Sequence, residues 1–130
     1  AASDVYKRQG NRVNIQDNST VHTTFEDSVA EIGDDVTIGH NVVVHGARIE
    51  ANALIGIGSV LLDNCVVGSN TIVAAGSVVL EKHILEPNSL YAGIPAKRIK
   101  TIDPARLESM IKRIAKDYVM YAGWYKNSED

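Results

Sequence analysis

A six-residue repeat of aliphatic side chains is the feature that most constrains how this chain can fold. From residue 32 to residue 85 an aliphatic residue returns at every sixth position, apart from one five-residue step that ends at Ile49. A helix would need a period of 3.6 residues, and a half-buried strand a period of two. A period of six predicts short strands joined by corners, as in a parallel β-helix. The repeated residues are Ile32, Ile38, Val44, Ile49, Ile55, Leu61, Val67, Val73, Val79 and Leu85.

The repeat also predicts a narrow core of aliphatic side chains. Three hexapeptides make one coil of a triangular prism, so residues about eighteen positions apart stack on one another. Ile15 and Val21 continue the pattern before an insertion between Phe25 and Glu31. Cys65 lies where other repeats have small residues, so we predict that it is buried. A single cysteine excludes a disulfide within the chain and favours a reducing compartment, so we expect a cytoplasmic protein.

The sequence predicts a single all-β domain in three segments. Residues 1–9 do not fit the repeat and are interpreted as an irregular cap or an artefact. Residues 10–100 are predicted to form the β-helix. Residues 101–130 are predicted to form a C-terminal α-helix that packs on it. Asp103 and Pro104 suit the N-cap and the first helical position, and apolar residues follow at spacings of three and four.

Composition narrows the range of functions. The net charge is −3, whereas a nucleic-acid-binding surface normally carries a basic patch, so we expect no nucleic-acid partner. No apolar run is long enough to span a membrane, and no signal peptide is apparent, so we expect no membrane association.

Two histidines occupy equivalent positions on adjacent coils. His22 follows Val21 by one residue, and His45 follows Val44 by one residue. Three repeats separate Val21 from Val44, which is one full coil. The two backbones should therefore lie roughly 4.8 Å apart, the spacing of neighbouring strands. Two imidazoles at this separation can converge on one metal ion, because Zn–N bonds are about 2.0–2.1 Å long.

A third histidine, His40, lies on the preceding face of the prism. Five residues of extended chain separate it from His45, or roughly 15 Å at about 3.3 Å per residue. His40 therefore cannot join the pair within one chain, but a neighbouring copy could supply it. Three copies around a threefold axis would form sites with three imidazoles and an open position, the arrangement of catalytic zinc. Iron and cobalt also suit three imidazoles.

Two polar residues are predicted to lie beside these histidines. Ile15 is expected to stack on Ile38, which places Asp17 next to His40 as a carboxylate that could orient the imidazole. The adjacent Gln16 could hydrogen-bond a water molecule at the metal.

Three stretches of the chain resemble the gamma-class carbonic anhydrase family of hexapeptide-repeat proteins. They are NIQDNSTVH (14–22), IGHNVVVHG (38–46) and YAGIPAKRIK (91–100). The resemblance implies a left-handed coil and a homotrimer with a metal ion, zinc or a related ion, at each subunit interface. It also implies the reversible hydration of CO2 to bicarbonate. The family's functional residues map onto the ligands His22, His40 and His45, onto Gln16 and Asp17 near the metal, and onto Tyr118 of the C-terminal helix.

Two alternatives to an active anhydrase remain open on the sequence. Phe25 stands about where the best-studied family members have a glutamate that shuttles protons, so the chain could be a weak or inactive metal-binding trimeric scaffold. A hexapeptide-repeat acyltransferase would share the coil and the exit segment. Such an enzyme needs one catalytic histidine and a coenzyme A groove, and it has no use for His22, His40 and His45 together.

Overall fold

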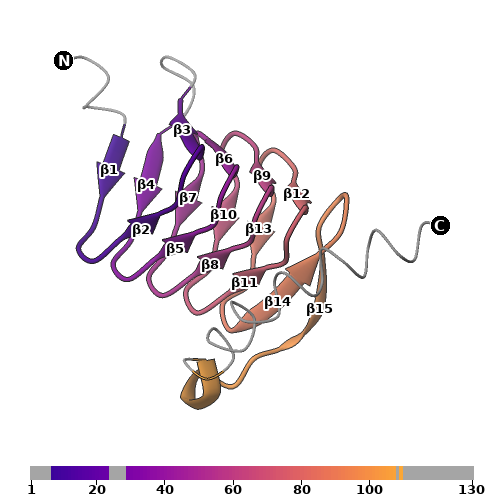
Figure 1. Cartoon of the computed structure of the whole chain (residues 1–130). Coiled ribbons are helices and arrows are strands. Elements are labelled where there is room, and N and C mark those ends of the chain that lie inside the picture. The colour runs from indigo at the N-terminus through magenta and orange to yellow at the C-terminus, as the bar shows by residue number, and fades with distance from the viewer. Residues whose placement is uncertain (1–6, 24–28, 108, 110–130) are drawn as a thin grey trace.

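The computed structural model describes residues 7–23, 29–107 and 109, which wind into stacked triangular coils (Figure 1). Strands from successive coils pair side by side and build the three faces of the prism. Face A contains β1 (Lys7–Gln9), β4 (Ala30–Ile32), β7 (Arg48–Ile49), β10 (Val66–Val67) and β13 (Ile84–Leu85). Face B contains β2 (Asn14–Ile15), β5 (Thr37–Ile38), β8 (Leu54–Ile55), β11 (Ile72–Val73), β14 (Ser89–Ala92) and β15 (Lys97–Thr101). Face C contains β3 (Thr20–His22), β6 (Val43–His45), β9 (Val60–Leu61) and β12 (Val78–Val79).

The strand register confirms the repeat read from the sequence. On face B, Ile15 pairs with Ile38, Ile38 with Ile55, Ile55 with Val73, and Val73 with Tyr91, all in parallel. Each aliphatic position therefore stacks on the equivalent position one coil away. The all-β, parallel β-helical architecture is as predicted, and it is consistent with the left-handed coil that the family resemblance implies.

Aliphatic side chains fill the interior of the prism, and small polar side chains close its corners. The repeated aliphatic residues from Ile38 to Leu85 are 0–1% exposed, and Cys65 is fully buried as predicted. The buried hydroxyls satisfy their hydrogen bonds on the backbone: Ser59 Oγ donates to Ala74 O at 3.0 Å, and Thr71 Oγ1 donates to Glu86 O at 2.8 Å.

Asparagine and aspartate at the corners explain how the chain turns so tightly. Such residues tolerate the left-handed conformation because their short polar side chains can hydrogen-bond locally. The non-glycine residues with positive φ are Arg12, Asn18, Asp35, Asn41, Asn52, Asn64, Asn70, Lys82 and Asn88.

The β-helix begins three residues earlier than predicted. Strand β1 pairs in parallel with β4, with Gln9 in register with Ile32. Residues 7–9 are therefore part of the coil, although the sequence analysis placed its start at residue 10. A glutamine at an aliphatic position hid the repeat. The described strands place no further coil outside β1, and Gln9 is exposed there.

The exit from the β-helix is a hairpin followed by the first turn of a helix. The chain reverses at Gly93, which has φ +105°, and β15 then runs antiparallel to β14. Asp103 Oδ1 accepts a hydrogen bond from Ala105 N at 3.0 Å and so caps a short 3-10 helix, η2 (Pro104–Arg106). Leu107 is buried in a small cluster with Leu54, Ile72 and Ile102. The predicted C-terminal helix otherwise lies outside the described residues, and the three-segment division of the chain stays a prediction.

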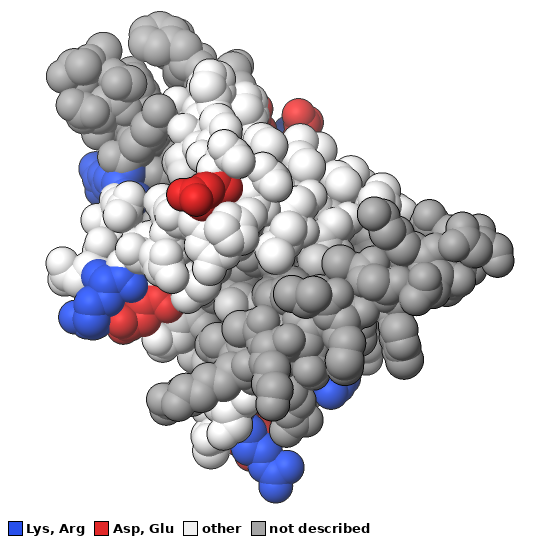
Figure 2. Space-filling view, viewed as in Figure 1, with Lys and Arg blue, Asp and Glu red and all other residues white. Residues whose placement is uncertain are grey.

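The charged side chains of the described residues on the face shown in Figure 2 lie in small separate groups of either sign, with uncharged surface between them. Among the described residues, no helix has both the length and the apolar character needed to cross a membrane.

Candidate metal centre

The predicted histidine pair lies on face C, at the ends of β3 and β6. His22 and His45 are in register as neighbours in a parallel ladder. Their ring centroids are 4.8 Å apart, and the ring planes are inclined by 14°. The two imidazoles therefore stack at the strand spacing, as the repeat predicted. His22 is exposed and His45 is half-buried, so the pair forms part of the outer surface of the prism.

A carboxylate that the sequence analysis missed holds one of the two rings. Asp63 Oδ1 lies 2.6 Å from His45 Nδ1. Both groups are partly shielded from water, with 31% of the His45 side chain and 17% of the Asp63 side chain exposed. When His45 is neutral, its Nδ1–H donates the hydrogen bond to the Asp63 carboxylate, and the lone pair is then on Nε2.

The signal that could have revealed Asp63 is its distance along the chain. It follows His45 by eighteen residues, the length of one regular coil. The five-residue step at Ile49 shortens this coil, so Val44 pairs with Leu61, seventeen residues later. Asp63 is consequently one position out of register with His45, and its side chain approaches the ring from the following corner.

The third predicted ligand, His40, stands apart from the pair, as the sequence analysis expected. It follows β5 at the corner that leads into β6, whereas His45 ends β6, so the two lie at opposite edges of face C. His40 is exposed, and its carbonyl oxygen accepts a hydrogen bond from Gly58 N at 2.9 Å. Within the described part of one chain, no three histidine, cysteine or acidic side chains gather closely enough to hold a metal ion.

The structure places Gln16 and Asp17 on the coil next to His40. Gln16 N donates to Ile38 O at 2.9 Å, and Asn41 N donates to Asp17 O at 3.2 Å. This register is the predicted one. Asp17 is exposed, and the contacts of the described residues include no hydrogen bond between its carboxylate and the His40 ring. Tyr118 and Phe25 lie outside the described residues.

The donor set of the pair suits a transition metal. Neutral imidazoles bind zinc, iron and cobalt well. Two nitrogens bound to one tetrahedral zinc ion lie about 3.3 Å apart, given Zn–N bonds of about 2.0–2.1 Å. Rings with centroids 4.8 Å apart must therefore tilt towards each other to share the ion. A metal-binding histidine commonly donates its other ring N–H to a carboxylate, which is the contact that His45 makes with Asp63.

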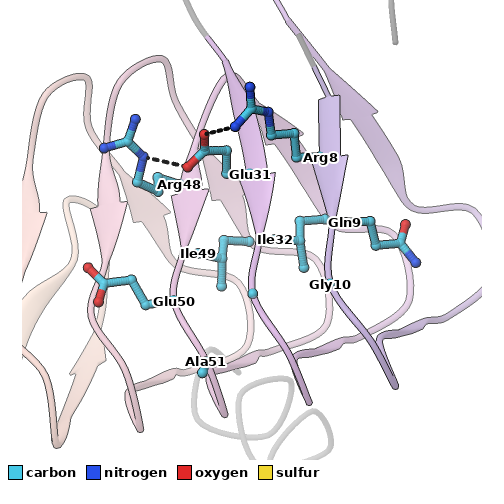
Figure 3. Close-up of a pocket in the computed structure, with 10 residues that line it drawn as sticks. Arg8, Gln9, Gly10, Glu31, Ile32, Arg48, Ile49, Glu50 and Ala51 are labelled. Atoms are coloured by element: carbon cyan, nitrogen blue, oxygen red, sulfur yellow. Dashed lines mark ion pairs between the residues drawn. The ribbon is translucent and has the colours of Figure 1, made fainter. Parts of the chain in front are cut away.

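A shallow depression of about 490 Å³ on face A lies away from the histidine pair (Figure 3). Glu31 lies between two arginines at one end of it, 3.0 Å from the Arg48 guanidinium and 4.0 Å from that of Arg8. These charges pair with one another, and both arginines are exposed. The depression therefore contributes no group to the candidate metal centre.

Comparisons with known proteins agree with this architecture. Residues 46–81 match the model of the bacterial transferase hexapeptide family, which comprises six repeats. The crystal structure of a Bacillus cereus protein provisionally assigned as an acetyltransferase superposes with a TM-score of 0.77 and is 37% identical. That match covers 93% of this chain and 69% of the other.

Curated relatives point to a narrower group. A carbonic anhydrase of Geobacillus kaustophilus is 50% identical over 90% of this chain, and the chain spans 63% of that relative's length. The probable carbonic anhydrase of Methanocaldococcus jannaschii is 46% identical over 85% of this chain and 68% of its own length. The mitochondrial gamma carbonic anhydrase 2 of Arabidopsis thaliana is 37% identical over 87% of this chain and 42% of its own length. The chain therefore belongs to the gamma-class carbonic anhydrase family of hexapeptide-repeat proteins.

Proposed function

We propose that this protein is a metal-dependent carbonic anhydrase that catalyses the reversible hydration of CO2 to bicarbonate. The observation that carries the proposal is the stacked pair of His22 and His45, in which His45 Nδ1 is hydrogen-bonded to Asp63. These two imidazoles on the outer surface of the β-helix would supply two of the three protein ligands of the metal site. Relatives named carbonic anhydrase support the choice of reaction.

The proposed site is shared between subunits of a homotrimer. His40 lies at one edge of face C, and the pair lies at the opposite edge. In a closed ring of three copies, one edge of each prism meets the other edge of its neighbour. Each interface would then join His22 and His45 of one subunit to His40 of the next, which makes three imidazole ligands.

The outer surface beside the pair supports an interface with a second copy. Val43 and Leu80 on face C are 37% and 46% exposed, and Ile84 on the adjoining face A is 68% exposed. Leu80 lies close to this site along face C. Its neighbour Val79 pairs with Leu61, and Asp63 follows Leu61 by two residues. Exposed apolar residues that continue from a polar site are typical of protein–protein contacts.

The chain's residues divide the proposed chemistry between them. When bound, a zinc, iron or cobalt ion would supply Lewis-acid activation of water for its addition to CO2. The three histidines would hold the ion. Gln16 would orient the reacting water through its side-chain amide, Asp17 would orient His40, and Tyr118 would lie close to the substrate. The reaction releases one proton for each CO2 hydrated, and this proton leaves to solvent or buffer.

The proposed setting is the cytoplasm. The chain has one cysteine, and Cys65 is buried within the coil, so its thiol needs no oxidising environment.

Metal content per chain, measured together with native mass, tests the shared site. We expect one metal ion per chain in a particle of three chains. Stopped-flow hydration of CO2 then tests the activity. A trimer that binds metal but hydrates CO2 no faster than buffer would make the protein a metal-binding scaffold. A monomer that binds one metal ion would refute the shared site.

An acyltransferase is the third candidate, after the metal-binding scaffold, and it is considered because solved structures of this fold include serine acetyltransferases. One of them, from Brucella abortus with coenzyme A bound, is 30% identical, has a TM-score of 0.62 and covers 75% of this chain and 41% of its own. Saturable binding of acetyl-CoA by the metal-free protein would favour this candidate. We place it third because it leaves the stacked histidines and Asp63 without a role.

A further inference from the structure

We propose that Asp63 is a positioning residue that fixes the tautomer and the orientation of His45. The claim that Asp63 prepares His45 to bind metal rests on the proposed function. The claim that Asp63 fixes the tautomer of His45 does not depend on it.

The contact is strong for a site near the surface. The distance between Asp63 Oδ1 and His45 Nδ1 is 2.6 Å, at the short limit for an N–H···O bond. A carboxylate acceptor makes such a bond shorter and about twice as strong as a bond between neutral groups. Partial burial of both side chains reduces the competition from water.

The backbone holds the carboxylate in place from the next coil. Asn64 N donates to Gly46 O at 2.9 Å, and Lys82 N donates to Asp63 O at 3.0 Å. The corner that carries Asp63 is therefore tied to the coils on both sides. Gly46, the residue in register with Asp63, has no side chain that could separate the carboxylate from the His45 ring.

The chemical result is an imidazole with a defined free nitrogen. The hydrogen bond made by one ring nitrogen determines where the proton lies on the other. With Nδ1–H donated to Asp63, Nε2 keeps its lone pair and the ring cannot rotate freely about its Cβ–Cγ bond. A metal ion that meets this ring needs neither to displace a proton nor to select a rotamer.

The two histidines of the pair consequently have different roles. His22 is exposed, and the contacts of the described residues give it the stacked ring of His45 but no carboxylate. We infer that His45 is the fixed ligand and that His22 adjusts its ring to the ion. The sequence alone predicts an orienting carboxylate only for His40, namely Asp17.

Nitrogen-15 NMR of the histidine side chains in the metal-free protein tests the proposal at a pH where imidazoles are neutral. A His45→Gln variant identifies the His45 signals. We expect wild-type His45 to be protonated on Nδ1. Asp63→Ala should shift His45 towards the Nε2–H form that free histidine favours, and Asp63→Asn should preserve the wild-type form because its carbonyl can still accept. Asp35→Asn is the matched control, since Asp35 pairs with Arg12 at 2.6 Å on a different corner.

Wild-type His45 protonated on Nε2 would overturn the proposal, and this result needs no variant to fold. An unchanged His45 tautomer in a folded Asp63→Ala variant would overturn it as well.

Metal affinity provides a second readout that separates this inference from the proposed function. In competition with a chromophoric chelator, Asp63→Ala should weaken zinc binding by about 10- to 100-fold, and Asp35→Asn should leave it unchanged. If neither wild type nor variants bind zinc, the proposed function fails, while the NMR result still decides the role of Asp63. If zinc binds equally well to wild type and Asp63→Ala, Asp63 does not prepare His45 as a ligand.

Discussion

At the scale of single residues, the Cys65 thiol shows how strongly the coil changes side-chain chemistry. Burial raises the pKa of Cys65 to about 12, and the nearby negative charge of Asp63 acts in the same direction. The ordinary value is 9.0. Because the folded protein holds this proton more tightly than the unfolded chain, the thiol contributes stability below pH 9. That contribution is lost as the pH rises from 9 through about 12.

We predict that a Cys65→Ala variant loses less stability in alkaline solution than wild type. Three pKa units correspond to at most about 4 kcal/mol. Urea denaturation at pH 8, 9.5 and 11 measures the free energy of unfolding of the two proteins. The effects of lysine and tyrosine titration cancel in the comparison, because both proteins contain the same lysines and tyrosines. Parallel loss of stability in the two proteins would show that the thiolate is tolerated inside the coil.

A second prediction concerns the aliphatic core. Leu61 is fully buried, whereas Ile99 on β15, outside the proposed subunit interface, is 59% exposed. Leu61→Ala should lower the free energy of unfolding by about 2–5 kcal/mol, because it leaves a cavity in a narrow core. Ile99→Ala should cost less than about 1 kcal/mol. Equal effects in denaturant titrations would contradict the assignment of Leu61 to the interior.

At the scale of structural elements, the corners are as important as the strands. Most corners use asparagine or aspartate with positive φ, and Gly58 and Gly76 take the same conformation at two others. A Cβ added at Gly76 would meet no atom within 4 Å. At Gly68, by contrast, a Cβ would lie 2.6 Å from Pro87 N and 2.8 Å from Leu85 O. The two glycines are therefore required for different reasons, conformation at Gly76 and space at Gly68.

Substitutions at these two glycines should separate the effects. Gly76→Asn should be nearly neutral, since asparagine occupies equivalent corners, and Gly76→Ala should cost about 1 kcal/mol from backbone strain. Gly68→Ala should cost about 3 kcal/mol or more, because backbone atoms of the next coil must move. Thermal unfolding of the three variants gives the order. A Gly68→Ala variant as stable as Gly76→Asn would refute the close packing of this corner.

The sequence predicted the elements well where the repeat was regular. The register of His22 with His45 follows from counting hexapeptides, and the structure confirms it. Two features could not be counted. Gln9 carries a polar side chain at an aliphatic position, which concealed β1. The contact between Asp63 and His45 depends on a one-residue offset between coils and on the direction of the Asp63 side chain. Neither follows from the hexapeptide repeat.

At the scale of the whole molecule, the candidate site is divided between the two edges of one face. The sequence predicted this division because His40 and His45 are five residues apart on an extended chain. The structure shows the same separation for one chain, with His40 at the corner before β6 and His45 at the end of β6. The arrangement of three chains depends on contacts between molecules, for which the repeat offers no rule.

Mixing two variants that each lack one proposed ligand tests the proposed trimer. The His40→Ala and His22→Ala proteins should each lose high-affinity metal binding. Random mixed trimers from equal amounts should regain about a quarter of the wild-type metal content, because each mixed trimer has one interface with all three ligands. Metal analysis after co-refolding measures the recovery, and His22→Ala mixed with itself is the control. Metal retained by His40→Ala alone, at one ion per chain, would contradict the shared site.

The stacking of His22 on His45 has a thermodynamic consequence. In a stack of coils each coil contacts only its neighbours, so a coil can open locally when its contacts with one neighbour break. On face C, β3 pairs with β6, and these are the two strands that carry the histidines. An ion bound by both rings would link the two coils, and its binding free energy would oppose their separation. Metal affinity and the slowing of amide hydrogen exchange in β3 would then both measure the coupling between metal binding and the pairing of β3 with β6.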